Sequence, residues 1–171
     1  HLTEEGKSLK AMHEGDSIKD HIPTAKELCN MVLHTCYMGS KYSSIVTRRR
    51  AHFLAHEIGA FHKECRIDGT IQSYLSILEQ TLEIPEGEES SHHMPRFQAE
   101  GGSMVEDLAL QNIQARTRMV SAYMMSQLLP WQRGWKKGFI LNLATGNVDE
   151  SLRGYMTKYD CSSGDLNPVG G

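Results

Sequence analysis

Apolar residues along the chain fall into short runs, and three of these runs have the length and spacing of β-strands. Met31 to Tyr37 is a mostly apolar run that predicts a buried strand. Phe61 to Ile67 alternates apolar with polar residues, which predicts a second strand. Phe139 to Leu143 predicts a third, which ends abruptly in turn-forming residues.

Helices are predicted between and after these strands, because apolar residues there recur at helical spacing. Thr47 opens one helix, which ends at Gly59, and residues 71–82 form another. A further helix follows the third strand, where Asn147 or Asp149 can cap it. The apolar positions are Ala51, Leu54, Ala55 and Ile58 in the first, and Val148, Leu152, Tyr155, Met156 and Tyr159 in the last.

Two capping boxes mark further helix starts, because a hydroxyl residue is followed three positions later by a glutamate. Thr24 with Glu27 begins a short helix, and Ser103 with Glu106 begins a long helix that Pro130 ends. The core candidates of the long helix are Val105, Leu108, Ile113, Val120, Tyr123 and Met124.

Strands that alternate with helices predict an α/β fold, a Rossmann-like parallel sheet flanked by helices. The 171 residues suit one domain. Residues 83–100 are acidic and rich in helix breakers, so we expect a mobile surface loop or an insertion there. Ligands of such folds bind beyond the carboxyl ends of the strands.

Charge and composition exclude several classes of partner. The formal net charge is −3, and Arg48 to Arg50 is the one dense basic run, so we expect no nucleic-acid partner. No stretch approaches the roughly 20 apolar residues of a membrane helix, so we expect no membrane. Four cysteines without zinc-type spacing indicate free thiols in a reducing, cytoplasmic compartment.

The histidines do not form a recognisable metal motif. His56 and Glu57 with His62 are not HExxH, because the second histidine comes six residues after the first instead of four. His52 and His56 share a helix face, which alone is weak support for a metal. We therefore expect surface or packing roles for them.

Four residues after the third strand could carry chemistry: Thr145, Glu150, Lys158 and Asp165. Each also has an ordinary structural role, in a turn for Thr145 and Asp165 and at a helix terminus for Lys158. Glu150 can cap its helix or bind a hard cation, and the residue alone favours the cap.

Two arginines of the long helix are further candidates. Arg116 lies four residues after Asn112, so the two share a face, and its forked guanidinium suits phosphate recognition. Arg118 points elsewhere and is expected to have a supporting role, and isolated helical arginines are usually solvated.

Three blocks of the sequence, in the right order, resemble the synthetase domain of eukaryotic-type glutamine-dependent NAD synthetases. The first runs from Leu28 to Arg48 and includes TCYMG, and the second is FQAEGGS through EDLALQNIQARTRMV. The third is VDESLRGYMTKYDCSSGDLNPVGG at the end of the chain. The resemblance implies a partial domain, 1–171, of the adenine nucleotide alpha-hydrolase-like fold (N-type ATP pyrophosphatase).

The resemblance also implies roles for single residues. It makes Thr145 an ATP contact and Glu150 a ligand of Mg²⁺. It makes Arg116, Lys158 and Asp165 contacts of deamido-NAD, with no residue certain to be catalytic. Cys161 lacks a base partner and is expected to be structural.

The implied reaction is the last step of NAD biosynthesis, carried out by a carbon–nitrogen ligase with glutamine as amide donor. Deamido-NAD and ATP form an adenylated intermediate, and ammonia from a glutaminase domain absent here converts it to NAD. The family is typically oligomeric, so we expect a homo-oligomer. Its pyrophosphate-binding SGGxDS string does not occur in these residues, so we expect this stretch alone to be inactive.

Two alternatives remain open at the level of the sequence. The shared fold permits another ATP pyrophosphatase that adenylates a different carboxylate, although the third block argues against it. The missing SGGxDS string permits a catalytically inactive, truncated or degenerate module for nucleotide binding or oligomerisation.

Overall fold

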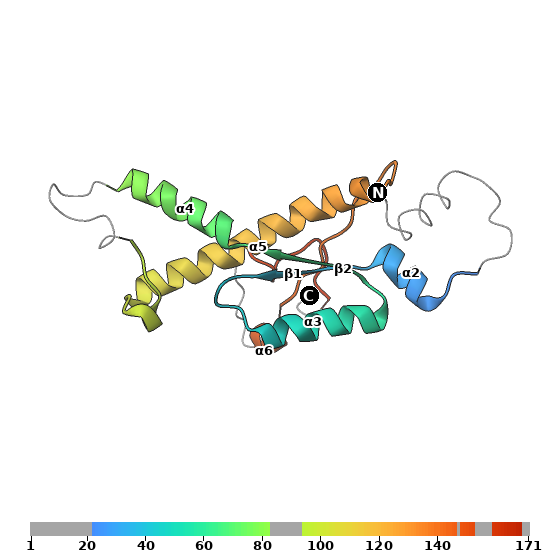
Figure 1. Ribbon diagram of the computed structural model, residues 1–171, viewed down its shortest axis with the longest axis horizontal. Helices are drawn as coiled ribbons and strands as arrows, with labels where there is room; N and C mark the ends of the chain where they lie inside the picture. Colours follow the sequence, from blue (N-terminus) through green and yellow to red (C-terminus); the bar gives the residue numbers. More distant parts are fainter. Residues whose placement is uncertain (1–21, 83–93, 147, 153–158, 169–171) are drawn as a thin grey trace.

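The structure, a computed structural model, describes residues 22–82, 94–146, 148–152 and 159–168, and Figure 1 shows their arrangement. The predicted alternation of strands and helices is confirmed over the first half of the chain. In chain order the elements are α2 (Ala25–Val32), β1 (His34–Gly39), α3 (Ile45–Ile58), β2 (Phe61–Arg66), α4 (Asp68–Thr81), the 3₁₀ helix η2 (Gln98–Glu100), α5 (Met104–Gln132) and α6 (Val148–Leu152).

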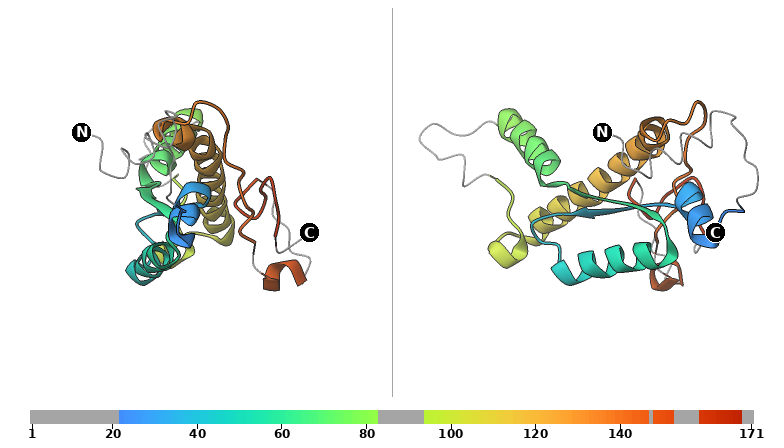
Figure 2. Two further views of the ribbon diagram at one scale, coloured as in Figure 1. Left: turned by 90° about the vertical axis from the view of Figure 1, so that its right-hand side faces the viewer. Right: turned by 45° about the vertical axis from the view of Figure 1, so that its right-hand side comes forward.

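The two strands form a parallel pair in register from His34↔Phe61 to Gly39↔Arg66, with α3 as the crossover between them. Figures 1 and 2 show α3 on one side of the strands and α5 on the other. Successive side chains of β2 accordingly point to opposite sides of the strand pair. Glu64 contacts Arg48 of α3, whereas Arg133 at the end of α5 lies over the ring of Phe61.

Helix starts follow the local capping chemistry. Both predicted capping boxes are present, Thr24 with Glu27 and Ser103 with Glu106. β1 begins three residues later than predicted, because α2 continues through Val32. The helix predicted from Thr47 begins two residues earlier, at Ile45, because the Ser44 side chain caps it. Residues Asp68 and Gly69, predicted as a turn, form the first turn of α4.

The prediction that Pro130 ends the long helix is wrong, because α5 continues to Gln132. Proline has no backbone N–H, so the carbonyl of Ser126, four residues earlier, has no helical donor from position 130. The amide of Ile140 donates to that carbonyl instead, at 3.0 Å. The proline therefore frees an acceptor that fixes the following segment against α5.

The prediction of a strand at Phe139 to Leu143 is also wrong. In the described residues this segment makes only one isolated parallel bridge, Leu143↔Leu166. Its backbone groups pair with the C-terminal loop. The amide of Asp165 donates to the carbonyl of Asn142 at 2.8 Å, and the amide of Ala144 donates to the carbonyl of Leu166 at 2.7 Å. The apolar run therefore follows a loop and does not extend the sheet.

The predicted apolar faces of the helices are largely exposed. On α5, Val105 is 75% and Val120 56% exposed, and Leu108 and Met124 are also exposed, so four of the core candidates are wrong. The buried positions of α5 are Leu110, Thr117, Ser126 and Pro130. On α3 only Ala55 is buried, and Leu54 and Ile58 are exposed. The buried positions of α5 thus combine apolar Leu110 and Pro130 with polar Thr117 and Ser126, and that of α3 is the small Ala55.

The predictions of the loop at 83–100 and of the last helix fall partly outside the described residues. Of the loop predicted at 83–100, residues 83–93 lie outside, and the remainder contains η2. The last helix is described over Val148–Leu152, and one of its predicted caps, Asn147, lies outside. No helix among the described residues combines the length and the apolar character needed to cross a bilayer.

Candidate functional site

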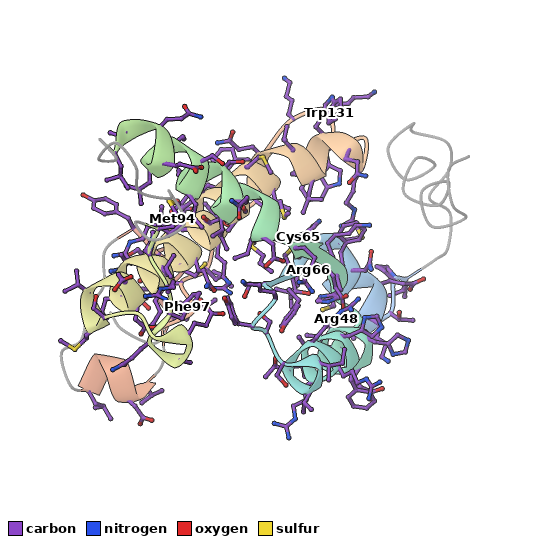
Figure 3. All side chains as sticks on the ribbon, turned by 60° about the vertical axis from the view of Figure 1, so that its left-hand side comes forward. Arg48, Cys65, Arg66, Met94, Phe97 and Trp131 are labelled. Atoms are coloured by element: carbon purple, nitrogen blue, oxygen red, sulfur yellow. The ribbon has the colours of Figure 1, made fainter. Side chains whose placement is uncertain are left out.

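The carboxyl ends of β1 and β2 lie at the same edge, because the strands are parallel. A pocket of about 300 Å³ opens there, beside the start of α3. Figure 3 shows Arg48, Cys65 and Arg66 grouped at this end of the strands. We call it the edge pocket. Its lining includes Tyr37, Ser40, Ser43, Ser44, Arg48 and Arg66.

The loop after β1 holds several hydroxyl groups at this edge. Ser40 is buried, and its amide donates to Ser43 Oγ at 2.9 Å. Ser40 Oγ also lies 3.4 Å from Gln114 Oε1, which links the loop to α5. Ser44 Oγ accepts from the amide of Val46 at 3.1 Å and so caps α3. The edge pocket therefore has a fixed polar wall beside a helix N-terminus.

Asp68, the first residue of α4, supports the same loop. Its Oδ1 accepts the backbone N–H of Lys41 at 2.7 Å, and its Oδ2 accepts Arg66 Nε at 2.8 Å. These two donors, the Lys41 amide first, hold the pKa of the Asp68 carboxyl below its usual value. A second pocket of about 180 Å³ is lined by Ser40, Lys41 and Asp68 among others.

Arg118 of α5 binds the strand edge, and its charge acts on the C-terminal loop. Its Nε donates to the carbonyl of Met38, near the end of β1, at 3.0 Å. Burial, followed by the charge of Asp160, raises the pKa of the Cys161 thiol, and the positive charge of Arg118 opposes that rise. A raised pKa leaves a thiol protonated and poorly nucleophilic at neutral pH.

Thr145 and Asp165 lie in two chain segments that bind each other. The amide and the Oγ1 of Thr145 both donate to the carbonyl of Cys161, at 2.7 and 2.9 Å. Asp165 Oδ2 accepts the amide of Asn142 at 2.8 Å, and Tyr123 Oη donates to its Oδ1 at 3.4 Å. We call residues 142–146 and 160–166 the C-terminal loop pair.

The close approach of the C-terminal loop pair depends on Gly164. A Cβ at this position would lie 2.6 Å from both the amide of Ala144 and the carbonyl of Asn142, closer than atoms can pack. Asp160, which is buried, shapes the same turn by accepting the amide of Ser162 at 2.9 Å. The turn-forming sequence therefore sets how closely the two segments meet.

Arg116 is placed differently from Thr145 and Asp165. Its Nη1 donates to Asn112 Oδ1 one helical turn earlier, as their shared face predicts. Positions 114 and 118 of α5 contact the region of β1, and position 116 lies on another side of the helix. None of the contacts described for Arg116 joins it to the C-terminal loop pair.

Lys158 lies outside the described residues, as does the side chain of Glu150, whose backbone belongs to α6. The serines of the edge pocket, Ser40, Ser43 and Ser44, carried no predicted role. The signal that could have found them is their position immediately after a predicted strand, where α/β sheets bind ligands.

A comparison with known protein families identifies the family of this chain. The family model described as NAD synthase matches residues 23–171. The chain belongs to the NAD synthase family. Glutamine-dependent NAD(+) synthetases are similar to it: the protein of Oryza sativa subsp. indica is 47% identical over 92% of the chain, and that of Saccharomyces cerevisiae 45% over 95%. The Drosophila melanogaster protein is 49% identical over 89%.

Solved structures confirm the predicted fold class. A glutamine-dependent NAD(+) synthetase from Cytophaga hutchinsonii superposes with a TM-score of 0.64, at 27% identity, over 88% of this chain and 22% of its own. An Acinetobacter baumannii enzyme of the same name, in complex with adenosine diphosphate, gives a TM-score of 0.56 at 20% identity, which shows the fold alone; the match covers 97% of this chain and 24% of that one.

The chain spans about a fifth of the length of the relatives it matches, 20% for the rice protein and 21% for the yeast protein. The described structure is therefore part of an adenine nucleotide alpha-hydrolase-like domain of this family.

Proposed function

We propose that the chain is part of the synthetase domain of a glutamine-dependent NAD synthetase. This carbon–nitrogen ligase converts deamido-NAD to NAD with ATP, through an adenylated intermediate, and takes ammonia from glutamine through another domain. The observation that carries the proposal is the identity of 45–49% that the rice, fly and yeast proteins share with 89–95% of this chain.

Within this function, Thr145 contacts ATP, and Arg116, Lys158 and Asp165 contact deamido-NAD. The exposure of both Thr145 and Asp165 in the C-terminal loop pair supports these roles. Asp165 uses one lone pair on each oxygen for Asn142 and Tyr123, so its carboxylate retains acceptor capacity for a ligand. The Arg116 guanidinium, oriented by Asn112, suits a phosphate of the dinucleotide.

Mg²⁺ is the metal that the family implies, and Glu150 is the residue we assign to it. A carboxylate in the first turn of α6, five residues after Thr145, has the oxygen-donor chemistry that Mg²⁺ prefers beside phosphates. The ion, when bound, would neutralise charge on the phosphates during adenylation. In this proposal, Arg116 and Lys158 bind the dinucleotide, and their positive charges stabilise the negative charge of its phosphates.

Isothermal titration with deamido-NAD, with and without ATP and Mg²⁺, tests the proposal. Arg116→Ala should weaken deamido-NAD binding roughly tenfold or more, because a hydrogen bond to a charged group is lost. Arg50→Ala is the matched control: it removes an exposed arginine from α3, and binding should stay unchanged.

Folding of each variant is checked by circular dichroism, so that loss of binding is not confused with unfolding. A folded chain that binds ATP but not deamido-NAD would favour the inactive nucleotide-binding module. Preference for another carboxylate substrate would favour a different ATP pyrophosphatase. Equal effects of Arg116→Ala and Arg50→Ala would contradict the role of Arg116.

A further inference from the structure

Three metal-binding side chains converge between α3 and β2, on the side of the strands that faces α3. They are His52 of α3 and His62 and Glu64 of β2. One nitrogen or oxygen atom from each lies within 4.8 Å of the others. We call them the His–His–Glu cluster. None of the three has a role in the function proposed above.

The distances suit a small transition-metal ion. Glu64 Oε1 lies 3.4 Å from His52 Nδ1 and 3.6 Å from His62 Nε2. A tetrahedral ion with bonds of about 2.0–2.1 Å to nitrogen and oxygen places its ligand atoms about 3.3–3.5 Å apart. Two of the three ligand separations therefore need little adjustment to accept such an ion.

His62 is oriented as a ligand would be. Its Nδ1 lies 2.8 Å from Thr35 Oγ1 on β1, and this hydrogen bond fixes the ring. Its other nitrogen, Nε2, is buried without a hydrogen-bond partner, in a side chain that is 12% exposed. Metal-binding histidines characteristically donate their second nitrogen to a neighbouring group, which leaves the first with a free lone pair.

The carboxylate of Glu64 is oriented by Arg48. Its Oε2 accepts Arg48 Nε at 2.6 Å, so Oε1 remains toward the two imidazoles. His52 is 66% exposed and lies on a helix, so its side chain can adjust to complete the set. The ring centroids of His52 and His62 lie 5.7 Å apart with the rings nearly perpendicular, an edge-to-face contact that brings the two imidazoles together.

We propose that His52, His62 and Glu64 bind a divalent transition-metal ion of the zinc type, with water as the fourth ligand. Two imidazoles and one carboxylate are a ligand set that zinc uses when one position stays open. The ion would link α3 to β2. Glu64 and Arg48 also line the edge pocket, so the ion would lie beside it.

Zinc titration of the chelator-treated chain, in competition with a chromophoric chelator, tests this proposal. We expect one site that prefers Zn²⁺ strongly over Mg²⁺, because imidazole ligands disfavour magnesium. Co²⁺ at the same site should show the visible absorption of tetrahedral cobalt. His52→Ala should weaken Zn²⁺ binding by at least the roughly 10–100-fold that loss of an outer-shell partner costs.

The matched control is His56→Ala, one helical turn after His52 and also exposed on α3, which should bind Zn²⁺ as the parent chain does. The chain has nine histidines, so zinc could bind elsewhere. Full binding in His52→Ala, equal losses in both variants, or no stoichiometric site would each overturn the proposal. None of these readouts requires deamido-NAD or ATP, so the test is independent of the proposed function.

Discussion

Three single residues affect the stability of this structure, two through their backbone conformation and one through its charged neighbour. Gly59 ends α3 in the left-handed region, at φ 80°, and Pro130 leaves a carbonyl free for another segment. His34 lies on the side of the strands that faces α5, against Phe61 and Arg133. Each of these residues gives a measurable consequence.

Gly59→Ala should destabilise the chain by about 1–3 kcal/mol, because a non-glycine residue is strained at positive φ. The added Cβ would also lie 2.8 Å from Lys26 Cβ and 2.9 Å from its carbonyl oxygen. Urea denaturation measures the change. Gly69→Ala is the control: it lies in the first turn of α4, and its Cβ would meet nothing within 4 Å. Equal losses in both variants would contradict the argument.

Stability should fall as the pH drops from about 6.5 to about 4. Burial, and then the charge of Arg133, lower the pKa of His34 from 6.5 to about 4 in the folded chain. The unfolded chain therefore binds a proton in this window that the folded chain does not, so unfolding is favoured by acid. Urea denaturation at several pH values measures the slope, and His34→Gln should flatten it. An unchanged slope in that variant would assign the effect to other groups.

At the scale of elements, the contacts between segments follow from a few polar groups. The buried positions of α5 lie on two sides of the helix: Thr117 lies on one, and Ser126, nine residues later, lies on the opposite one. The carbonyl of Ser126 binds the segment after the helix. The C-terminal loop pair closes through Thr145 and Asp165. These contacts hold the segment of 139–146 beside α5.

Pro130→Ala should loosen this segment while α5 stays helical. The new N–H at position 130 would compete with the Ile140 amide for the Ser126 carbonyl. Hydrogen exchange measures the result: the Ile140 amide should lose protection. The Ala60 amide, which donates to the carbonyl of Ala55 far from this contact, is the internal control. Unchanged protection at Ile140 would show that the bond does not depend on the proline.

The elements that could be predicted from the sequence are those whose cause is local. Both capping boxes and the glycine end of α3 depend on residues within one turn, and all three were predicted correctly. The strand at 139–143 was not, because a strand needs a partner and this segment pairs with residues 165 and 166 instead. The core face of α5 likewise depends on which neighbours cover it.

The candidate site was predictable to a similar degree. Thr145 and Asp165 were expected to follow a third strand; the described structure has no strand there, and the two residues lie instead in loop segments that pair with each other. The sequence could not show that Arg118 reaches the carbonyl of Met38, because the two residues are 80 positions apart. For the same reason, His52 could be matched along the helix with His56 but not across the fold with His62 and Glu64.

At the scale of the whole molecule, the chain exposes much apolar surface. On α3 alone, Phe53 is 66%, Leu54 61% and Ile45 53% exposed. Among the described residues the buried apolar side chains are few by comparison, and they include Ala55, Ala60, Ile67 and Leu110. Large exposed apolar patches on a folded domain mark surfaces that contact another protein or another part of the same one.

The 171 residues studied alone should therefore self-associate as their concentration rises. Phe53→Ser combined with Leu54→Ser should reduce that association, because it removes two exposed apolar side chains of α3 without opening a cavity in the core. Sedimentation velocity at several concentrations measures the effect, and Arg50→Ser on the same helix is the control. If the double variant associates as strongly as the parent chain, α3 is not the contact surface, and the exposed residues of α5, Val105 and Val120 among them, become the next to change.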